Sequence, residues 1–148
     1  MRAISLKESL QIIEGAFARS AELKLKPLTI VVLDAGGHVK AAQKQDGCSL
    51  MRYDIAKGKA YAALAMGRSS KLVLQKSREK PIFMDVLRKM SDEQLFLEGG
   101  GQLILDDSGE VVGAVGITGD VNEMDDECAL AGIRAAGFQA DPNQYTAD

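Results

Sequence analysis

The sequence predicts an α+β fold, a layered α/β sandwich in which helices cover the faces of a mainly antiparallel sheet. Two pairs of apolar, β-branched segments are each joined by a short glycine-containing turn, which favours hairpins and hence antiparallel pairing. Helical patterns precede, separate and follow these pairs. The length of 148 residues suits one domain with its own core. We expect that domain to cover residues 1–137, followed by a polar C-terminal tail over residues 138–148 with an ordered turn at most.

The first element is expected to be a helix over residues 5–23. Ser5 and Glu8 have the spacing of a capping box, in which each side chain can satisfy a free N–H at the helix start. Apolar residues then recur at helical intervals, at Leu6, Leu10, Ile13, Phe17 and Ala21. One side of this helix should therefore lie against a sheet.

Residues 28–33 and 38–44 are expected to form the first hairpin. The first segment is a run of β-branched and aliphatic residues, which is typical of a buried strand. The turn between them, residues 34–37, contains two glycines that can adopt positive φ. The second segment then returns beside the first.

Residues 49–67, 69–78 and a segment beginning at Pro81 are expected to be helical. The first has an alanine-rich face, which permits close packing against a sheet or another helix. The span 71–89 is rich in lysine and arginine, and this pattern is typical of a solvated face. The alternative is that it attracts an anionic small molecule.

The second hairpin is predicted to consist of residues 102–105 and 110–118, and residues 94–98 can form a further short strand. Within the last strand, Gly113 and Gly116 leave its faces almost bare, which often marks close approach by another backbone or a ligand. We interpret the pattern as close packing of a helix on the sheet. The final helix should begin at Asn122, with Asp125 completing a capping box, and end at Gly137.

Composition excludes several classes of protein. The net charge of −3, the low aromatic content of 5% and the absence of tryptophan argue against a nucleic-acid partner. No apolar run approaches the roughly 20 residues that span a bilayer, and no signal-peptide core is evident, so we expect a cytoplasmic protein without membrane association. Cys48 and Cys128 are interpreted as thiols. A single histidine excludes a multi-histidine metal site.

Several residues can carry chemistry, and each has a structural alternative. Lys59 lies in the alanine-rich face and either extends to water or pairs with Asp34, Asp54 or Glu98; if buried, it can bind a carboxylate or transfer a proton. The amides of Gly99, Gly100 and Gly101 form either an anion-binding nest or a tight turn. His38, just after the first turn, is either an exposed turn residue or a ligand for haem iron.

The glycine pattern of residues 113–119 does not indicate a nucleotide site. Its spacing differs from the dinucleotide fingerprint, and the preceding connection is a hairpin. The helix that follows opens with Glu123, Asp125, Asp126 and Glu127, whose charges would repel phosphate.

Several blocks together carry a resemblance to a known family. They are residues 33–39 (Leu-Asp-Ala-Gly-Gly-His-Val), 45–47 (Gln-Asp-Gly), 53–61 (Tyr-Asp-Ile-Ala-Lys-Gly-Lys-Ala-Tyr), 98–101 (Glu-Gly-Gly-Gly), 113–119 (Gly-Ala-Val-Gly-Ile-Thr-Gly) and 125–129 (Asp-Asp-Glu-Cys-Ala). The chain resembles the GlcG/HbpS-like family, also called the haem-degrading or haem-binding domain family, over residues 5 to 137. The resemblance implies a profilin-like sandwich with a five-stranded antiparallel sheet, self-association as dimers up to octamers, and haem as a possible cofactor.

The resemblance carries over to some residues and not to others. Asp34 to Gly37, Lys59, Thr118 and Asp125 match positions of the family's motifs, whereas the proline usual after the Gly100–Gly101 pair is absent. Family members include an extracellular haem sensor and small proteins encoded beside glycolate, diol, glycerol or aromatic-degradation enzymes. His38 and the Thr118 hydroxyl are the nearest candidates for an iron ligand.

Three hypotheses follow. In the first, the protein binds haem or a related tetrapyrrole at a subunit surface. In the second, it is an enzyme or auxiliary protein acting on a small carboxylate in a catabolic pathway. Lys59 and Arg52 would then hold the anion, the Gly99–Gly101 amides would stabilise negative charge, and Asp34, Glu98 or Asp125 would move a proton. In the third, it is an oligomeric structural partner of a neighbouring enzyme. The sequence places the site where the last strand meets the last helix, between Thr118 and Asp125.

Overall fold

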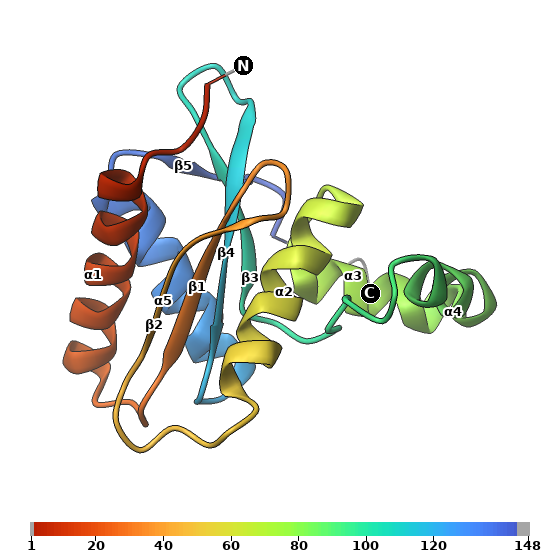
Figure 1. Ribbon diagram of the computed structural model, residues 1–148, viewed down its shortest axis with the longest axis horizontal. Helices are drawn as coiled ribbons and strands as arrows, with labels where there is room; N and C mark the ends of the chain where they lie inside the picture. The colour runs from red at the N-terminus through yellow and green to blue at the C-terminus, as the bar shows by residue number, and fades with distance from the viewer. Residues whose placement is uncertain (1, 145–148) are drawn as a thin grey trace.

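The computed structural model describes residues 2–144 and has an antiparallel sheet flanked by helices (Figure 1). The strands are β1 (Thr29–Asp34), β2 (Val39–Lys44), β3 (Gly101–Leu105), β4 (Val111–Thr118) and β5 (Gln139–Ala140), in the order β2-β1-β4-β3-β5. The helices are α1 (Leu6–Leu23), α2 (Arg52–Met66), α3 (Ser70–Glu79), α4 (Pro81–Met90) and α5 (Asn122–Ala135). The α+β sandwich and its five-stranded sheet, expected from the sequence, are therefore confirmed.

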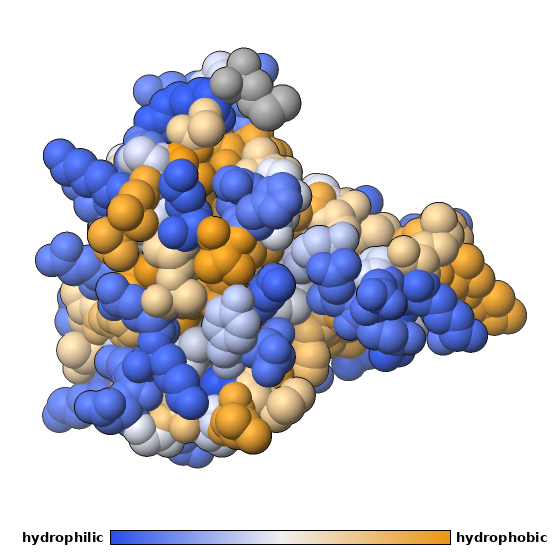
Figure 2. All heavy atoms as spheres, viewed as in Figure 1, coloured by the Kyte–Doolittle hydropathy of each residue, from blue (hydrophilic) through white to orange (hydrophobic). Residues whose placement is uncertain are grey.

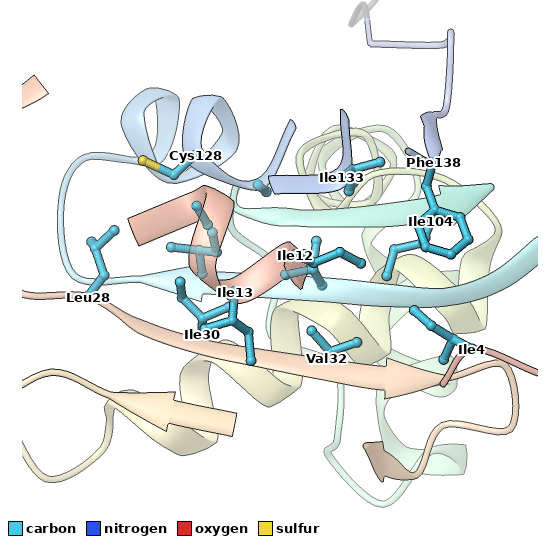
Figure 3. Close-up of a cluster of buried hydrophobic side chains, with 14 of the residues drawn as sticks. Ile4, Ile12, Ile13, Leu28, Ile30, Val32, Ile104, Cys128, Ile133 and Phe138 are labelled. Atoms are coloured by element: carbon cyan, nitrogen blue, oxygen red, sulfur yellow. The ribbon is translucent and has the colours of Figure 1, made fainter. Parts of the chain in front are cut away.

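Helices α1 and α5 cover one face of the sheet, and α2 covers the other (Figure 1). The larger core lies under α1 and α5, where Ile12 and Ile13 of α1 and Ile133 of α5 pack toward Ile30 and Ile104 of the sheet (Figure 3). These side chains are almost completely buried. Under α2, the alanine-rich face packs on Val31, Leu33 and Ala114.

The glycines of β4, the central strand, are explained by the approach of neighbouring backbone. A side chain at Gly116 would overlap the carbonyl of Ala56 in α2, and one at Gly113 would overlap the carbonyl of Leu33 in β1. The predicted close packing of a helix on this strand is confirmed. The bare face of β4 is therefore filled by α2 and is not a ligand pocket.

Three local predictions differ from the structure. Residues 94–98 form no strand, because the amide of Phe96 donates to the Gly58 carbonyl of α2 and Glu98 bonds back to Phe96. The N-cap of α5 is Val121, not Asn122, and it has no side-chain cap. Instead of completing a capping box, Asp125 is buried and accepts from the amide of Asp120.

The C-terminal stretch also differs from its prediction. Residues 138–148 were expected to hold a turn at most, but β5 pairs with the outer edge of β3. Phe138 directs its ring into the core beside Ile104 (Figure 3), and this anchor places the next residues at the sheet edge. The last part of the predicted tail, residues 145–148, lies outside the described residues.

Helices α3 and α4, residues 70–90, project from the body as an arm (Figure 1). Helix α4 packs on α3, and its Met84 lies in a small buried cluster with Ala62 of α2, Val73 of α3 and Leu95. No helix among residues 2–144 is both long and apolar enough to cross a membrane.

Candidate functional site

Lys59 of α2 and Asp125 of α5 form a buried ion pair at one end of the sheet. The Lys59 ammonium donates to Asp125 Oδ2 at 3.1 Å and to the carbonyl of Ile117 at 2.9 Å. Both side chains are nearly inaccessible, at 3% and 1% exposure. The alternative that Lys59 is buried and paired is thus confirmed, but its partner is Asp125, and the expectation of Asp34, Asp54 or Glu98 was wrong.

The strand register explains why Asp34 cannot reach Lys59. In the β1–β4 pairing, Thr29 lies opposite Thr118, whereas Asp34 lies opposite Gly113. Five residues of antiparallel strand span about 17 Å, so Asp34 is at the other end of the sheet. Asp125 arrives instead because the chain turns at Gly119, where φ is +141°, and brings the start of α5 over the end of β4.

Burial dominates the electrostatics of this pair. It lowers the pKa of Lys59, against the attraction of the Asp125 charge. It raises the pKa of Asp125 to about 6, although the Lys59 charge acts in the opposite direction. Burial also raises the pKa of neighbouring Asp126. Such a pair links α2, β4 and α5, but its charges are already matched and both side chains are shielded from water.

The glycine turn before β3 has the geometry of a tight turn. The amide of Gly100, where φ is +121°, donates to Asp126 Oδ1 at 2.9 Å. The amide of Gly101 donates to Ser70 Oγ at 2.8 Å. Two of the three amides expected to form an anion nest therefore have acceptors within the protein. Beside them, Glu98 accepts from the Asn122 side chain at 2.6 Å.

The fold brings the side chains of Arg52 and Thr118 into contact with each other. Arg52 Nη1 donates to Thr118 Oγ1 at 3.0 Å, and its Nε donates to Ser49 Oγ at 3.2 Å. Thr118 is only 2% exposed. The contact ties the start of α2 to the end of β4 and leaves the threonine hydroxyl poorly placed for a large planar ligand.

A cavity of about 850 Å³ lies between α3 and α5, beside the strand-to-helix junction that the sequence singled out. Leu74 and Leu130 provide apolar surface, and Lys71 and Arg78 are its cations. Its carboxylates are Glu79, Glu98, Glu123, Asp126 and Glu127. Lys59 and Asp125 are not among its lining residues. The excess of negative charge disfavours an anionic carboxylate in this cavity.

His38 and Asp34 lie at the opposite end of the sheet, in the β1–β2 turn. Asp34 Oδ1 accepts from the amides of Gly36 and His38 at 2.9 and 3.0 Å, which fixes the turn. Burial alone would raise the pKa of Asp34, but these hydrogen bonds and the nearby imidazole outweigh it, so the pKa lies below its usual value. The imidazole is 84% exposed, with Nδ1 3.5 Å from Asp34 Oδ1.

An apolar hollow of about 490 Å³ adjoins this turn. Its walls come from Ala35, Gly36, Leu64, Gly67, Leu103 and Val111. The His38 ring lies directly beside Gly36, because a Cβ on Gly36 would be only 3.2 Å from His38 Nδ1. The turn thus contributes Ala35 and Gly36 to the lining of the hollow, whereas the exposed imidazole of His38 and the Asp34 carboxylate beside it are not among the lining residues.

Sequence reasoning did not find three polar residues that organise the buried end. Gln102 donates to Asp126 Oδ1 at 2.8 Å, and Ser70 Oγ accepts from Gly101 while donating to the Glu98 carbonyl. The sequence signal for Gln102 was its position, because it is a polar residue at the start of an otherwise apolar strand. For Asp126, the signal was that it directly follows Asp125. Only one of two adjacent carboxylates can face Lys59, so the other must have different partners, which are Gly100 and Gln102.

Comparisons with known proteins agree with the fold. The family model described as "Haem degrading protein HbpS-like" matches residues 4–134. A curated relative is the "Uncharacterized 15.0 kDa protein in dhaT-dhaS intergenic region" of Citrobacter freundii, 25% identical over 122 residues, covering 82% of this chain and 84% of the relative.

Solved structures extend the comparison. A PduOC:heme complex has a TM-score of 0.80 at 24% identity and covers 93% of this chain and 97% of its own. Klebsiella pneumoniae protein ORFY has a TM-score of 0.82 at 21% identity, with 92% of each chain covered. A double mutant of Streptomyces reticuli HbpS has a TM-score of 0.81 at 19% identity, covering 93% of this chain and 89% of its own. At these identities the likeness concerns the fold.

Proposed function

The chain belongs to the HbpS-like family of haem degrading proteins, and we propose that it binds haem or a related tetrapyrrole through His38. The family and the haem-bound structural neighbour support a haem-related ligand. The observation that carries the proposal is the exposed imidazole of His38, flanked by Asp34, in a turn whose Ala35 and Gly36 line an apolar hollow.

The position of Asp34 suits His38 for ligating a metal. A carboxylate facing Nδ1 favours the tautomer with its proton on that nitrogen, which leaves the Nε2 lone pair for iron. Asp34 is itself fixed by two backbone amides, so it can hold the ring direction. When bound, haem supplies an iron centre with ligand-binding or electron-transfer chemistry.

The residues around the hollow fit a planar apolar ring. Leu64, Leu103 and Val111 provide aliphatic surface, and Gly36 and Gly67 have no side chains to block a flat ligand. Ligand sites are commonly apolar surfaces with a few placed polar groups. The larger cavity between α3 and α5 fits less well, because the described residues that line it include no histidine, cysteine, methionine or tyrosine, and its carboxylates would repel haem propionates.

The described geometry favours this proposal over a carboxylate-converting enzyme. Lys59 is paired with Asp125, and the amides of Gly100 and Gly101 are occupied. Arg52 is bound to Thr118. The groups that would hold and activate a small carboxylate therefore already have partners within the protein.

Haem titration tests the proposal. Wild-type protein should shift the Soret band with saturable stoichiometry, and His38→Ala should abolish the shift. Lys40→Ala, an exposed change in the same hairpin, is the matched control and should bind as the wild type does. Thr118→Ala should also retain the shift. Loss in Thr118→Ala with retention in His38→Ala would overturn the assignment to His38, and a shift that all variants share without saturation would overturn specific binding.

A further inference from the structure

The cavity between α3 and α5 has no part in the proposed haem site. Its volume of about 850 Å³ lies within the range of roughly 300–1,000 Å³ that is typical of small-molecule pockets. Within residues 2–144, the backbones of α3 and α5 stay apart, and each helix contacts β3. Figure 2 shows hydrophobic residues gathered at the end of the arm; these belong to α4, which contributes no described residue to the cavity. The cavity is therefore a separate space with two walls of its own.

Negative charge predominates in this cavity. Among the described residues, five carboxylates line it, against two cations, Lys71 and Arg78. Both cations lie on α3, whereas four of the carboxylates come from α5 and from the turn before β3. Each wall also has one leucine, Leu74 on α3 and Leu130 on α5. A cation with an aliphatic chain complements both properties, because the carboxylates attract its charge and the leucines bury its methylene groups.

Asp126 lines the cavity with one carboxylate oxygen turned toward the glycine turn. The two hydrogen bonds that its side chain accepts within the described chain, from the Gly100 amide and from Gln102, both go to Oδ1. Its Oδ2 lies beside Gly99, also a lining residue, where a Cβ would be only 2.8 Å from it. The φ of Gly99 is outside the left-handed region, so the close approach of Asp126, and not the backbone, requires glycine here. Burial raises the pKa of this carboxyl, so a bound ammonium would stabilise its charged form.

The carboxylates of the cavity are spread out and do not converge on one point. Within the described residues, no group of three or more histidine, cysteine, aspartate or glutamate side chains could hold a metal ion. Glu123 and Glu127 are one helical turn apart on α5, which is about 6 Å along the helix axis. Glu127 is already paired with Arg19 at 3.2 Å, whereas Glu123 is exposed. Negative charges at such intervals match an extended organic cation better than a metal ion.

We propose that this cavity binds an aliphatic polyamine, a linear molecule with two or more ammonium groups joined by short methylene chains. One ammonium would lie at Asp126 Oδ2 and another at Glu123, and the methylene chain would contact Leu74 and Leu130. Lys71 would oppose binding by repulsion, but the carboxylates outnumber the cations. This proposal does not depend on haem binding, because His38 lies at the opposite end of the sheet.

Isothermal titration calorimetry with spermidine at low salt tests the carboxylates. The wild type should bind with a saturable one-to-one stoichiometry. Glu123→Gln and Asp126→Asn should each weaken the affinity about threefold to tenfold, because they remove a charge but keep the side-chain shape and an acceptor oxygen. Glu14→Gln, an exposed change on α1 with the same effect on net charge, is the matched control and should bind as the wild type does. Equal weakening in the control, or no saturable binding by the wild type, would overturn the proposal.

A change of the opposite sign tests the class of ligand. Lys71→Gln should strengthen spermidine binding about threefold, because it removes a repelling charge, whereas Lys7→Gln on α1 should have no effect. Weaker binding in Lys71→Gln would contradict a purely cationic ligand. Saturable binding of magnesium ions with the affinity of spermidine would mean an inorganic-cation site and would also overturn the proposal. His38→Ala should bind spermidine as the wild type does, and loss of binding in this variant would assign the amine to the haem site instead.

Discussion

The two ends of the central β1–β4 pair use similar residues in opposite ways. At one end, Asp125 and Lys59 are buried, and burial raises the pKa of the carboxyl to about 6. At the other, Asp34 lies beside an exposed imidazole, and backbone amides hold the pKa of the carboxyl below its usual value. The comparison shows that a carboxylate beside a basic group does not by itself define a site: one pair links the core, and the other remains open to a ligand.

The largest effect is expected when the buried end loses one partner. Lys59→Met leaves the Asp125 carboxylate buried and unpaired, which should lower the free energy of unfolding by about 3–5 kcal/mol. Urea denaturation followed by circular dichroism measures the change. Lys57→Met, two positions earlier in α2 and half-exposed, should change it by less than about 0.5 kcal/mol.

A second substitution sharpens this test. Lys59→Met/Asp125→Leu replaces the pair with apolar side chains and should be more stable than Lys59→Met, because no charge remains buried without a partner. If Lys59→Met lost less than about 1 kcal/mol, or the double variant were the less stable, the buried pair would not have the role described here.

The next effect depends on pH. Because the pKa of Asp125 is raised in the folded state from 3.8 to about 6, the protonated carboxyl stabilises the fold at low pH, and this contribution is lost as pH rises between those values. The stability of the wild type relative to Asp125→Asn should therefore fall over that interval, by on the order of 2 kcal/mol.

The difference in stability between the wild type and Asp125→Asn separates the Lys59–Asp125 pair from the carboxylates elsewhere in the molecule. Glu8, Asp34, Asp106 and Asp120 have lowered pKa values, so their contributions are lost as pH falls, in wild type and variant alike. Removing the Asp125 charge also takes away the attraction that opposes the lowering of the Lys59 pKa by burial, so the slope of the difference reports the Lys59–Asp125 pair. Parallel curves from pH 4 to 7 in urea titrations would contradict the raised pKa.

The two ends also differ in how far the sequence alone could describe them. The Asp34–Gly37 turn and its exposed histidine depend on neighbours within five residues, so local turn chemistry was enough to place them. The partner of Lys59 lies 66 positions away and depends on where Gly119 turns the chain, which no local pattern encodes. Likewise, the glycines of β4 predicted a close approach, but only the packed fold shows that the carbonyl of Ala56 makes it.

The smallest effect on stability is expected at the exposed end, where the effect on binding should be clear. Asp34→Asn keeps an oxygen that can accept from the Gly36 and His38 amides, so the turn should persist and unfolding should change by less than about 1 kcal/mol. It removes the charge facing Nδ1 of His38, and loss of such an outer partner typically weakens metal binding about 10- to 100-fold. Haem titration should therefore show a weaker affinity with the Soret shift retained, and Asp107→Asn in the other hairpin turn should bind as the wild type does. Unchanged affinity in Asp34→Asn would mean that the carboxylate only shapes the turn, and the contrast between the two ends would then lie in burial alone.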